Sequence, residues 1–137
     1  LSDQFCIQRH RQSFNGLISK DIDILFANED EICSLAQTNS LVNAIEYCKN
    51  LGILIAVTIG EKGSILISSN KVIEIQAIPV ENVVDLTGAG DLFAAGFLFG
   101  LARNKTLEEC GRYGSLASSE IISHFGARPF RNLSELI

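Results

Sequence analysis

The chain has 137 residues, of which 47% are hydrophobic, and a formal net charge of −5. This length and hydrophobic content allow a globular domain with a buried core and exclude a disordered chain. The acidic balance and the lack of a basic cluster argue against nucleic acid or an anionic membrane as a partner. The longest apolar run, residues 92–102, contains two glycines and is too short to span a membrane.

Hydrophobic periodicity predicts alternating helices and strands in the first half of the chain. We expect helices at 5–17, 31–36 and 40–51, and strands at 21–27 and 53–59. The second half predicts a tight turn at 60–63, a hairpin of strands 64–67 and 71–77, and a strand-like segment ending near Val84. Helices are then expected at 92–102 and 106–124, with 133–137 either a last helix or a frayed end. This order indicates an α/β fold with mostly parallel strands.

Four polar residues, 28–31, follow the first predicted strand directly. Open α/β sheets bind ligands at the carboxyl ends of their strands, so Asn28 and Glu31 are candidate ligand contacts. The alternative is that Asn28 or Asp30 caps the helix that begins here, and the residues alone favour this capping role. Because Glu31 lies in a loop at a strand end, we expect it to be partly exposed.

The second candidate site is the segment 85–91, between the strand-like segment and the apolar helix. Gly88 and Gly90 allow unusual backbone conformations and close approach of a ligand. The free N–H groups of the helix start form a site for an anion, usually a phosphate. Asp91 would repel a resting phosphate, but it suits a general base for an attacking hydroxyl. The alternative is an ordinary tight turn, with Asp91 matching the helix dipole.

The sequence from Asp85 to Phe97 reads Asp-Leu-Thr-Gly-Ala-Gly-Asp-Leu-Phe-Ala-Ala-Gly-Phe. It resembles the C-terminal signature of the ribokinase-like (PfkB) family of sugar and nucleoside kinases. It is not a Walker A loop, which would end in Gly-Lys-Ser/Thr. The resemblance implies a ribokinase-like open, mostly parallel sheet flanked by helices. It also implies that residues 1–137 form the C-terminal part of a single kinase domain, without the N-terminal half that carries the lid and a lid-mediated homodimer contact.

The resemblance implies transfer of the ATP γ-phosphoryl group to the hydroxymethyl (5′-OH) group of a nucleoside or sugar. The backbone N–H groups of Gly88, Ala89 and Gly90 would bind the transferring phosphoryl, and Asp91 would be the base. Three further residues would lie beside the nucleotide phosphates: Thr58, Gly60 and Gly63.

The same resemblance assigns Asn28 and Glu31 to a network of Mg²⁺-bound waters and phosphate, since Mg²⁺ keeps several of its waters. Asp85 and Thr87 match the side chains of a site for a monovalent cation such as K⁺, whose backbone ligands would come from near Phe125 and Gly126.

Three segments favour an adenosine-kinase-like member of the family: Leu-Ser-Asp-x-Phe, Phe-Ala-Asn-Glu-Asp-Glu and Ser-Glu-x-Ile-x-x-x-Gly-Ala-Arg-Pro. A ribokinase or fructokinase is the runner-up, and a catalytically silent nucleotide-binding fragment is a third possibility. The four cysteines are scattered, which indicates buried, reduced thiols in a cytoplasmic protein. His10 and His124 lack neighbours at metal-ligand spacing.

Overall fold

The computed structural model describes residues 1, 3–69 and 71–135. The chain divides into two compact units. Unit 1 comprises Leu1–Ile59 and Ile65–Ile73, and unit 2 comprises Gly60–Ser64 and Glu74–Ile137.

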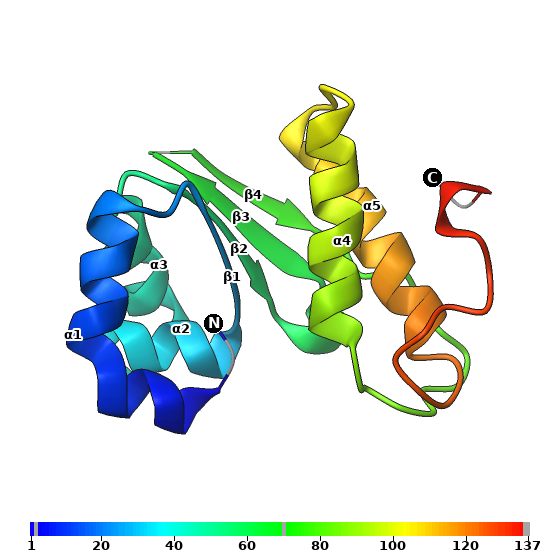
Figure 1. Ribbon diagram of the computed structural model, residues 1–137, viewed down its shortest axis with the longest axis horizontal. Coiled ribbons are helices and arrows are strands. Elements are labelled where there is room, and N and C mark those ends of the chain that lie inside the picture. The colour runs from blue at the N-terminus through cyan, green and yellow to red at the C-terminus, as the bar shows by residue number, and fades with distance from the viewer. Residues whose placement is uncertain (2, 70, 136–137) are drawn as a thin grey trace. The chain divides into compact units, whose positions relative to one another are not determined.

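A four-stranded open sheet with strand order β1-β2-β3-β4 is the central feature of the fold (Figure 1). Its strands are β1 (Ile24–Asn28), β2 (Leu54–Thr58), β3 (Ser64–Ser68) and β4 (Lys71–Ile75). β1 and β2 run parallel, and the two helices α2 (Glu29–Ala36) and α3 (Leu41–Lys49) lie between them in sequence. The connections from β2 to β3 and from β3 to β4 are too short for a parallel crossover, so these pairs are antiparallel and the sheet is mixed.

Three helices of unit 1 pack with the sheet: α1 (Gln4–Lys20), α2 and α3. Alternate side chains of β1, β2 and β3 face the same core, as the two-residue period of a strand requires. The core residues are Ile7, Ile18, Leu25, Ala27, Ile32, Leu35, Ala44, Cys48, Ile55, Val57, Ile65 and Ile67. Because these side chains are packed in the core, β1 and β2 are held in place, and so are the polar residues at their carboxyl ends.

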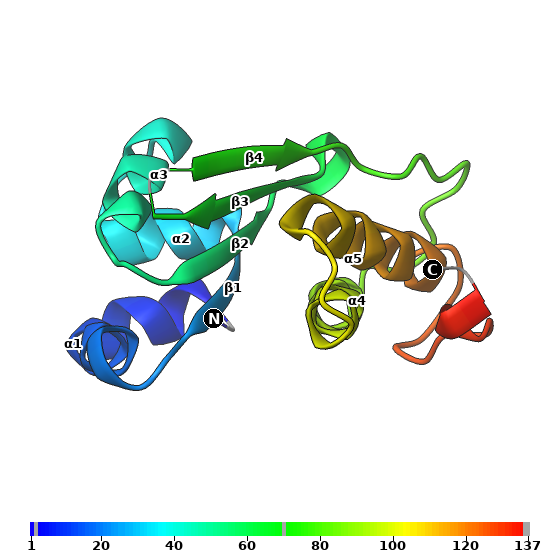
Figure 2. The ribbon, with the colours of Figure 1, turned by 90° about the horizontal axis from the view of Figure 1, so that it is seen from above.

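Unit 2 is built on two packed helices, α4 (Ala89–Ala102) and α5 (Leu107–Ile121), which lie side by side in Figures 1 and 2. Glycines on both helices allow the close approach. A β-carbon added at Gly96 would stand 2.4 Å from the Tyr113 carbonyl oxygen, and one at Gly114 would stand 2.8 Å from that of Phe93. The sequence predicts a long helix over 106–124, and α5 ends three residues earlier, at Ile121.

Several boundaries differ from the sequence-based expectation. α1 continues to Lys20 instead of ending at residue 17, and β1 begins at Ile24 instead of residue 21. The segment near Val84 is not a strand; Val83 and Val84 are exposed, and the Val84 N–H donates to the Ile122 carbonyl at 2.8 Å. α4 begins at Ala89 instead of residue 92, because Gly88 already acts as its N-cap. The chain's last described element is the short 3₁₀ helix η2 (Leu133–Glu135).

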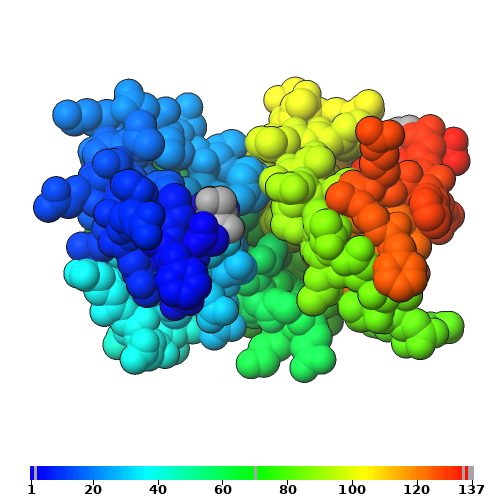
Figure 3. Space-filling model, turned by 60° about the horizontal axis from the view of Figure 1, so that its bottom comes forward, coloured from blue at the N-terminus to red at the C-terminus, as the bar shows by residue number. Residues whose placement is uncertain are grey.

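The segment after α5 is open to solvent: residues 125–132, which include Phe125 and Phe130, are all exposed, and the orange-to-red part of the chain is on the surface in Figure 3. Among the described residues, no helix is long and apolar enough to cross a membrane.

Candidate functional site

Asn28 and Thr58 end two neighbouring parallel strands and are direct partners in the register. Their side chains therefore stand at the same edge of the sheet, the edge at which open α/β sheets bind ligands. Thr58 is half-buried and Asn28 is exposed. Together with Glu31, they form what we call the strand-end cluster.

Glu31 and Asn28 form a reciprocal capping box at the start of α2. The Asn28 side-chain oxygen accepts the Glu31 N–H at 2.9 Å, and Glu31 Oε2 accepts the Asn28 N–H at 3.0 Å. The capping role weighed for Asn28 in the sequence analysis is thus present. Glu31 is only 7% exposed, so the expectation that it would be partly exposed was wrong. The reason is that the cap draws the side chain back over the helix start.

One oxygen of Glu31 remains available after capping. Oε1 has no hydrogen-bond partner among the described residues. It is also not fully buried, unlike Oε2 of Glu120, so solvent can reach it. A carboxylate that is fixed through one oxygen and open at the other fits indirect contact with a hydrated divalent cation.

The turn at 60–63 is the 3₁₀ helix η1 (Gly60–Lys62) followed by Gly63. Gly60 has a φ of 62°, and a β-carbon there would meet nothing within 4 Å, so its backbone is open to a ligand. Gly63 is different: a β-carbon there would stand 2.0 Å from the Ile75 carbonyl oxygen. Gly63 is buried, and its glycine is required by packing against the end of β4.

The start of α4 is the second cluster, and it lies in unit 2. Gly88 adopts a φ of 84° as the N-cap, and no side chain caps this helix. The Ala89 N–H donates to the Leu86 carbonyl at 3.1 Å, so this proposed phosphoryl donor is already engaged. Within the described chain, the N–H groups of Gly88, Gly90 and Asp91 have no protein acceptor. Gly90 is exposed, and a β-carbon there would meet nothing within 4 Å.

Asp85 organises this turn through three hydrogen bonds. Its Oδ1 accepts the Thr87 N–H at 2.9 Å and the Thr87 hydroxyl at 2.7 Å. Its Oδ2 accepts the Gly126 N–H at 3.0 Å, a contact between residues 41 positions apart. The Thr87 hydroxyl, then the N–H groups of Gly126 and Thr87, lower the pKa of Asp85 and keep it ionised.

Asp91 lies in the first turn of α4 with an exposed side chain. Among the described residues, it makes no capping hydrogen bond, which removes one of the structural roles available to an acid at this position. The remaining alternatives are a favourable charge at the helix N-terminus and a chemical role.

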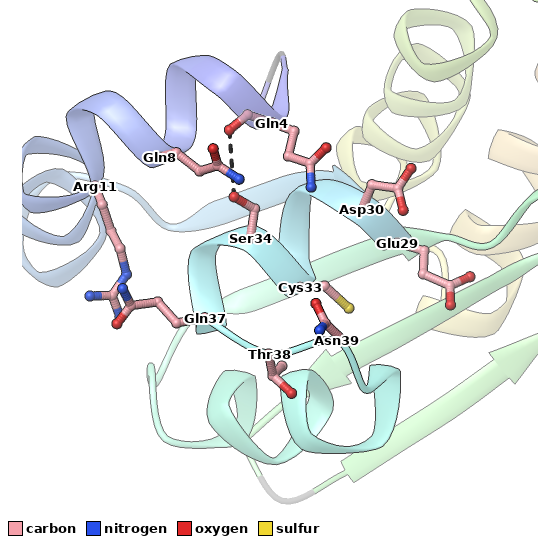
Figure 4. Close-up of a pocket in the computed structure, with 10 residues that line it drawn as sticks. All are labelled: Gln4, Gln8, Arg11, Glu29, Asp30, Cys33, Ser34, Gln37, Thr38 and Asn39. Carbon is pink, nitrogen blue, oxygen red and sulfur yellow. Dashed lines mark hydrogen bonds between the residues drawn. The ribbon is translucent and has the colours of Figure 1, made fainter.

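Unit 1 also contains an open polar pocket of about 540 Å³ beside α1 and α2 (Figure 4). Glu29 and Asp30 line one end, and Arg11 lies at the other, where its Nε–H donates to the Leu35 carbonyl. The lining does not include Asn28, Glu31 or Thr58, so this pocket is separate from the strand-end cluster. In the described part of the chain, no group of three or more His, Cys, Asp or Glu side chains could hold a metal ion.

Comparison with known proteins bears directly on these clusters. The model of the pfkB family of carbohydrate kinases matches residues 2–132. The chain belongs to the pfkB family. Residues 85–91, with the turn that begins α4, are the part that carried the resemblance, and the mixed open sheet with its helices is the ribokinase-like α/β fold.

The proteins similar to this pfkB-family chain include an adenosine kinase, a ribokinase and a cytidine kinase. A structure of adenosine kinase from Sinorhizobium meliloti is 41% identical with a TM-score of 0.95, covering 98% of this chain and 42% of that one. A structure of Arabidopsis thaliana ribokinase complexed with ribose and ATP is 38% identical with a TM-score of 0.74, covering 82% and 38%. Cytidine kinase from Thermococcus kodakarensis is 34% identical over 121 residues, covering 86% and 43%. The chain spans less than half the length of these proteins.

Sequence reasoning missed two features. The family resemblance predicted that Asp85 and the backbone near Gly126 lie at one cation site, but it did not predict the direct hydrogen bond from the Gly126 N–H to Asp85. The second is Glu120, which is buried on the packed face of α5; an acid at a position of this helix otherwise occupied by small and apolar residues is the sequence signal that marks it.

Proposed function

We propose that this chain supplies the ATP side of a pfkB-family kinase that transfers the γ-phosphoryl group to the hydroxymethyl group of a nucleoside or sugar. One observation carries the proposal. The turn before α4 leaves the N–H groups of Gly88, Gly90 and Asp91 without protein acceptors, next to an exposed carboxylate. Unpaired donors at a helix start stabilise the charge that develops on a phosphoryl group in transfer.

In this proposal, Asp91 accepts the proton of the attacking hydroxyl. Mg²⁺, when bound, would neutralise charge on the phosphates, and Glu31 Oε1 would contact it through water. Thr58 and Gly60 would contact the nucleotide phosphates. Gly63 would act through the shape of its turn, because its own backbone is packed against Ile75.

A monovalent cation such as K⁺ fits the oxygens at Asp85 and Thr87, and it belongs to the proposal. The Asp85 carboxylate stays ionised, and its two oxygens have more acceptor positions than the three donors occupy. The chemistry of this donor set, hard oxygen atoms with one negative charge, suits such an ion.

For the acceptor, we propose adenosine or a related nucleoside. The support is the 41% identity with the Sinorhizobium adenosine kinase over nearly the whole chain. A sugar acceptor is the second candidate, because the Arabidopsis ribokinase is 38% identical.

The test is the substitution Gly90→Ala in the product of the whole gene. A methyl group at 90 meets no protein atom, so the fold is retained, but it enters the space where the phosphoryl group would lie. We expect turnover of ATP with adenosine to fall about 100-fold, the usual cost of a lost oxyanion donor. The melting temperature should stay or rise, since alanine favours a helix over glycine.

Gly16→Ala is the matched control, because Gly16 is also helical and open, on α1. It should leave turnover unchanged. Adenosine, cytidine, ribose and fructose are compared as acceptors by ADP release. Full activity of Gly90→Ala would refute the anion site, and no ADP release with any acceptor would favour a catalytically silent protein.

A further inference from the structure

Glu120 lies in the last turn of α5, and its side chain accepts hydrogen bonds from the segment that follows the helix. Its side chain is buried, with the residue only 8% exposed. Its Oε1 accepts the N–H groups of Phe130 at 2.9 Å and Arg131 at 3.0 Å. Because these two donors lie ten and eleven residues further along the chain, one carboxylate oxygen closes residues 120–131 into a loop.

His124, which is itself part of this loop, contacts three other loop residues: Glu120, Phe125 and Phe130. Its Nε2 is 3.3 Å from Glu120 Oε1, and its Nδ1 is 3.3 Å from the Phe125 carbonyl oxygen. Its ring stacks on Phe130 with the centroids 3.8 Å apart and the planes 13° from parallel. The loop is therefore held by hydrogen bonds and a ring stack, although residues 125–132 are all exposed.

The middle of this loop contacts the turn that begins α4. The Gly126 N–H donates to Asp85 Oδ2, and Asp85 in turn holds Thr87. Ala127 lies on Gly88, where an added β-carbon would stand 3.1 Å from the Ala127 β-carbon. The Glu120 carboxylate is thus linked, through one loop, to the residues that set the geometry of the proposed phosphoryl site.

Local stability alone does not account for Glu120. Its second oxygen, Oε2, is buried without a hydrogen-bond partner in the described part of the chain. A half-satisfied buried carboxylate costs folding free energy and calls for another explanation.

We propose that Glu120 is a positioning residue, which holds loop 120–131 so that Gly126 fixes Asp85 and, through it, the turn at Gly88 on which ATP is bound. This inference rests on the proposed function and adds a residue that acts at a distance from the reacting atoms. It predicts that loss of the carboxylate weakens the ATP side of the reaction and leaves the acceptor side unchanged.

The test compares Glu120→Gln, which keeps the size and removes the charge, with Glu109→Gln in the product of the whole gene. Glu109 caps the opposite end of the same helix, where its Oε2 accepts the Thr106 N–H at 2.9 Å. A residue that only stabilises α5 predicts similar behaviour for the two variants. We expect Glu120→Gln to raise the KM for ATP about tenfold, the effect of one weakened hydrogen bond to a charged group, with the KM for the acceptor unchanged. Glu109→Gln should change neither.

Hydrogen exchange of the Gly126, Phe130 and Arg131 amides gives a readout that needs no ATP. We expect these amides to exchange about tenfold faster in Glu120→Gln and at the wild-type rate in Glu109→Gln. Glu120→Ala should raise the KM for ATP and the amide exchange rates further. If Glu120→Ala fails to fold, the results for Glu120→Gln still test the proposal. Unchanged exchange in Glu120→Gln, or an equal rise in both KM values, would overturn the proposal. A wild-type protein that makes no ADP would instead defeat the proposed function, while the exchange data still report whether Glu120 holds the loop.

Discussion

Gly96 lies so close to Tyr113 that a β-carbon at position 96 would stand 2.4 Å from the Tyr113 carbonyl oxygen. The backbone of α5 thus occupies the place of a side chain on α4. We expect Gly96→Ala to lower the free energy of unfolding by about 1–3 kcal/mol, the usual cost of overpacking a tight contact. Gly16→Ala, on an open helix face, should raise it by up to about 1 kcal/mol. Urea unfolding measures the free energy of unfolding of both variants. If the two substitutions change it in the same direction, the packing argument is contradicted.

Asp91→Asn separates a chemical role from a structural one. If Asp91 is the general base, kcat falls by about 10²- to 10⁴-fold while the affinity for ATP falls little or rises. If it only matches the helix dipole, turnover stays and stability drops by about 0.3–1 kcal/mol. Steady-state kinetics and thermal melting of the same samples distinguish the two. Near-normal turnover would remove the central claim for this residue.

Asp85→Asn is the companion variant. Asparagine places an N–H₂ or a neutral oxygen opposite the Gly126 N–H, so the link between the loop and the turn is weakened. If Asp85 also contacts a monovalent cation, raising K⁺ should partly restore activity. The Asp91→Asn defect should not respond to K⁺, and an identical K⁺ response of both variants would argue against the assignment.

Glu31→Gln tests the strand-end cluster. Glutamine can still accept the Asn28 N–H, because a capping box is formed by Glu or Gln, so little stability should be lost. We expect a higher Mg²⁺ concentration for half-maximal turnover, since the open oxygen loses its charge. Glu109→Gln changes the other capping box of the chain in the same way and should leave the Mg²⁺ profile unchanged. Identical profiles for Glu31→Gln and the wild type would leave Glu31 with its capping role alone.

Cys48 provides a prediction about pH. Burial, and then the neighbouring Cys33, raise the pKa of the Cys48 thiol from an ordinary 9.0 to about 12. A raised pKa means that the native state favours the neutral thiol, so this contribution to stability is complete below pH 9 and is lost as the pH rises towards 12. Iodoacetamide at pH 8 should label half-exposed Cys6 and spare Cys48 until the protein is unfolded. Equal native labelling rates would contradict the burial of Cys48.

Local patterns predicted most of the fold because local causes produce it. β2 follows from a β-branched run, and α5 begins at the Thr106–Glu109 capping box that the sequence predicted. Val83 and Val84 have the same strand propensity, but the Val84 N–H is taken by Ile122 near the end of α5, so no strand forms. That contact joins distant segments, and propensity contains no information about it.

The candidate site shows the same division. The motif predicted Gly88 at a special backbone position and Asn28 at a strand end, and the structure has both. It could not predict that the Ala89 N–H is used by Leu86, or that Gly63 is a packing glycine. These facts depend on which backbone atoms meet after folding.

Asn28 and Thr58 are register partners at the ends of β1 and β2, so insertions are tolerated only where they leave this register unchanged. An insertion at Gly52 would fall at an exposed position, since an added β-carbon there meets nothing within 4 Å, although Leu51 and Ile53 beside it pack against the core. An insertion within β2 would shift its register by one residue and turn every buried side chain of the strand to the opposite face. Variants of different length, natural or engineered, should therefore place their changes at Gly52 and keep the spacing from Leu54 to Thr58 constant.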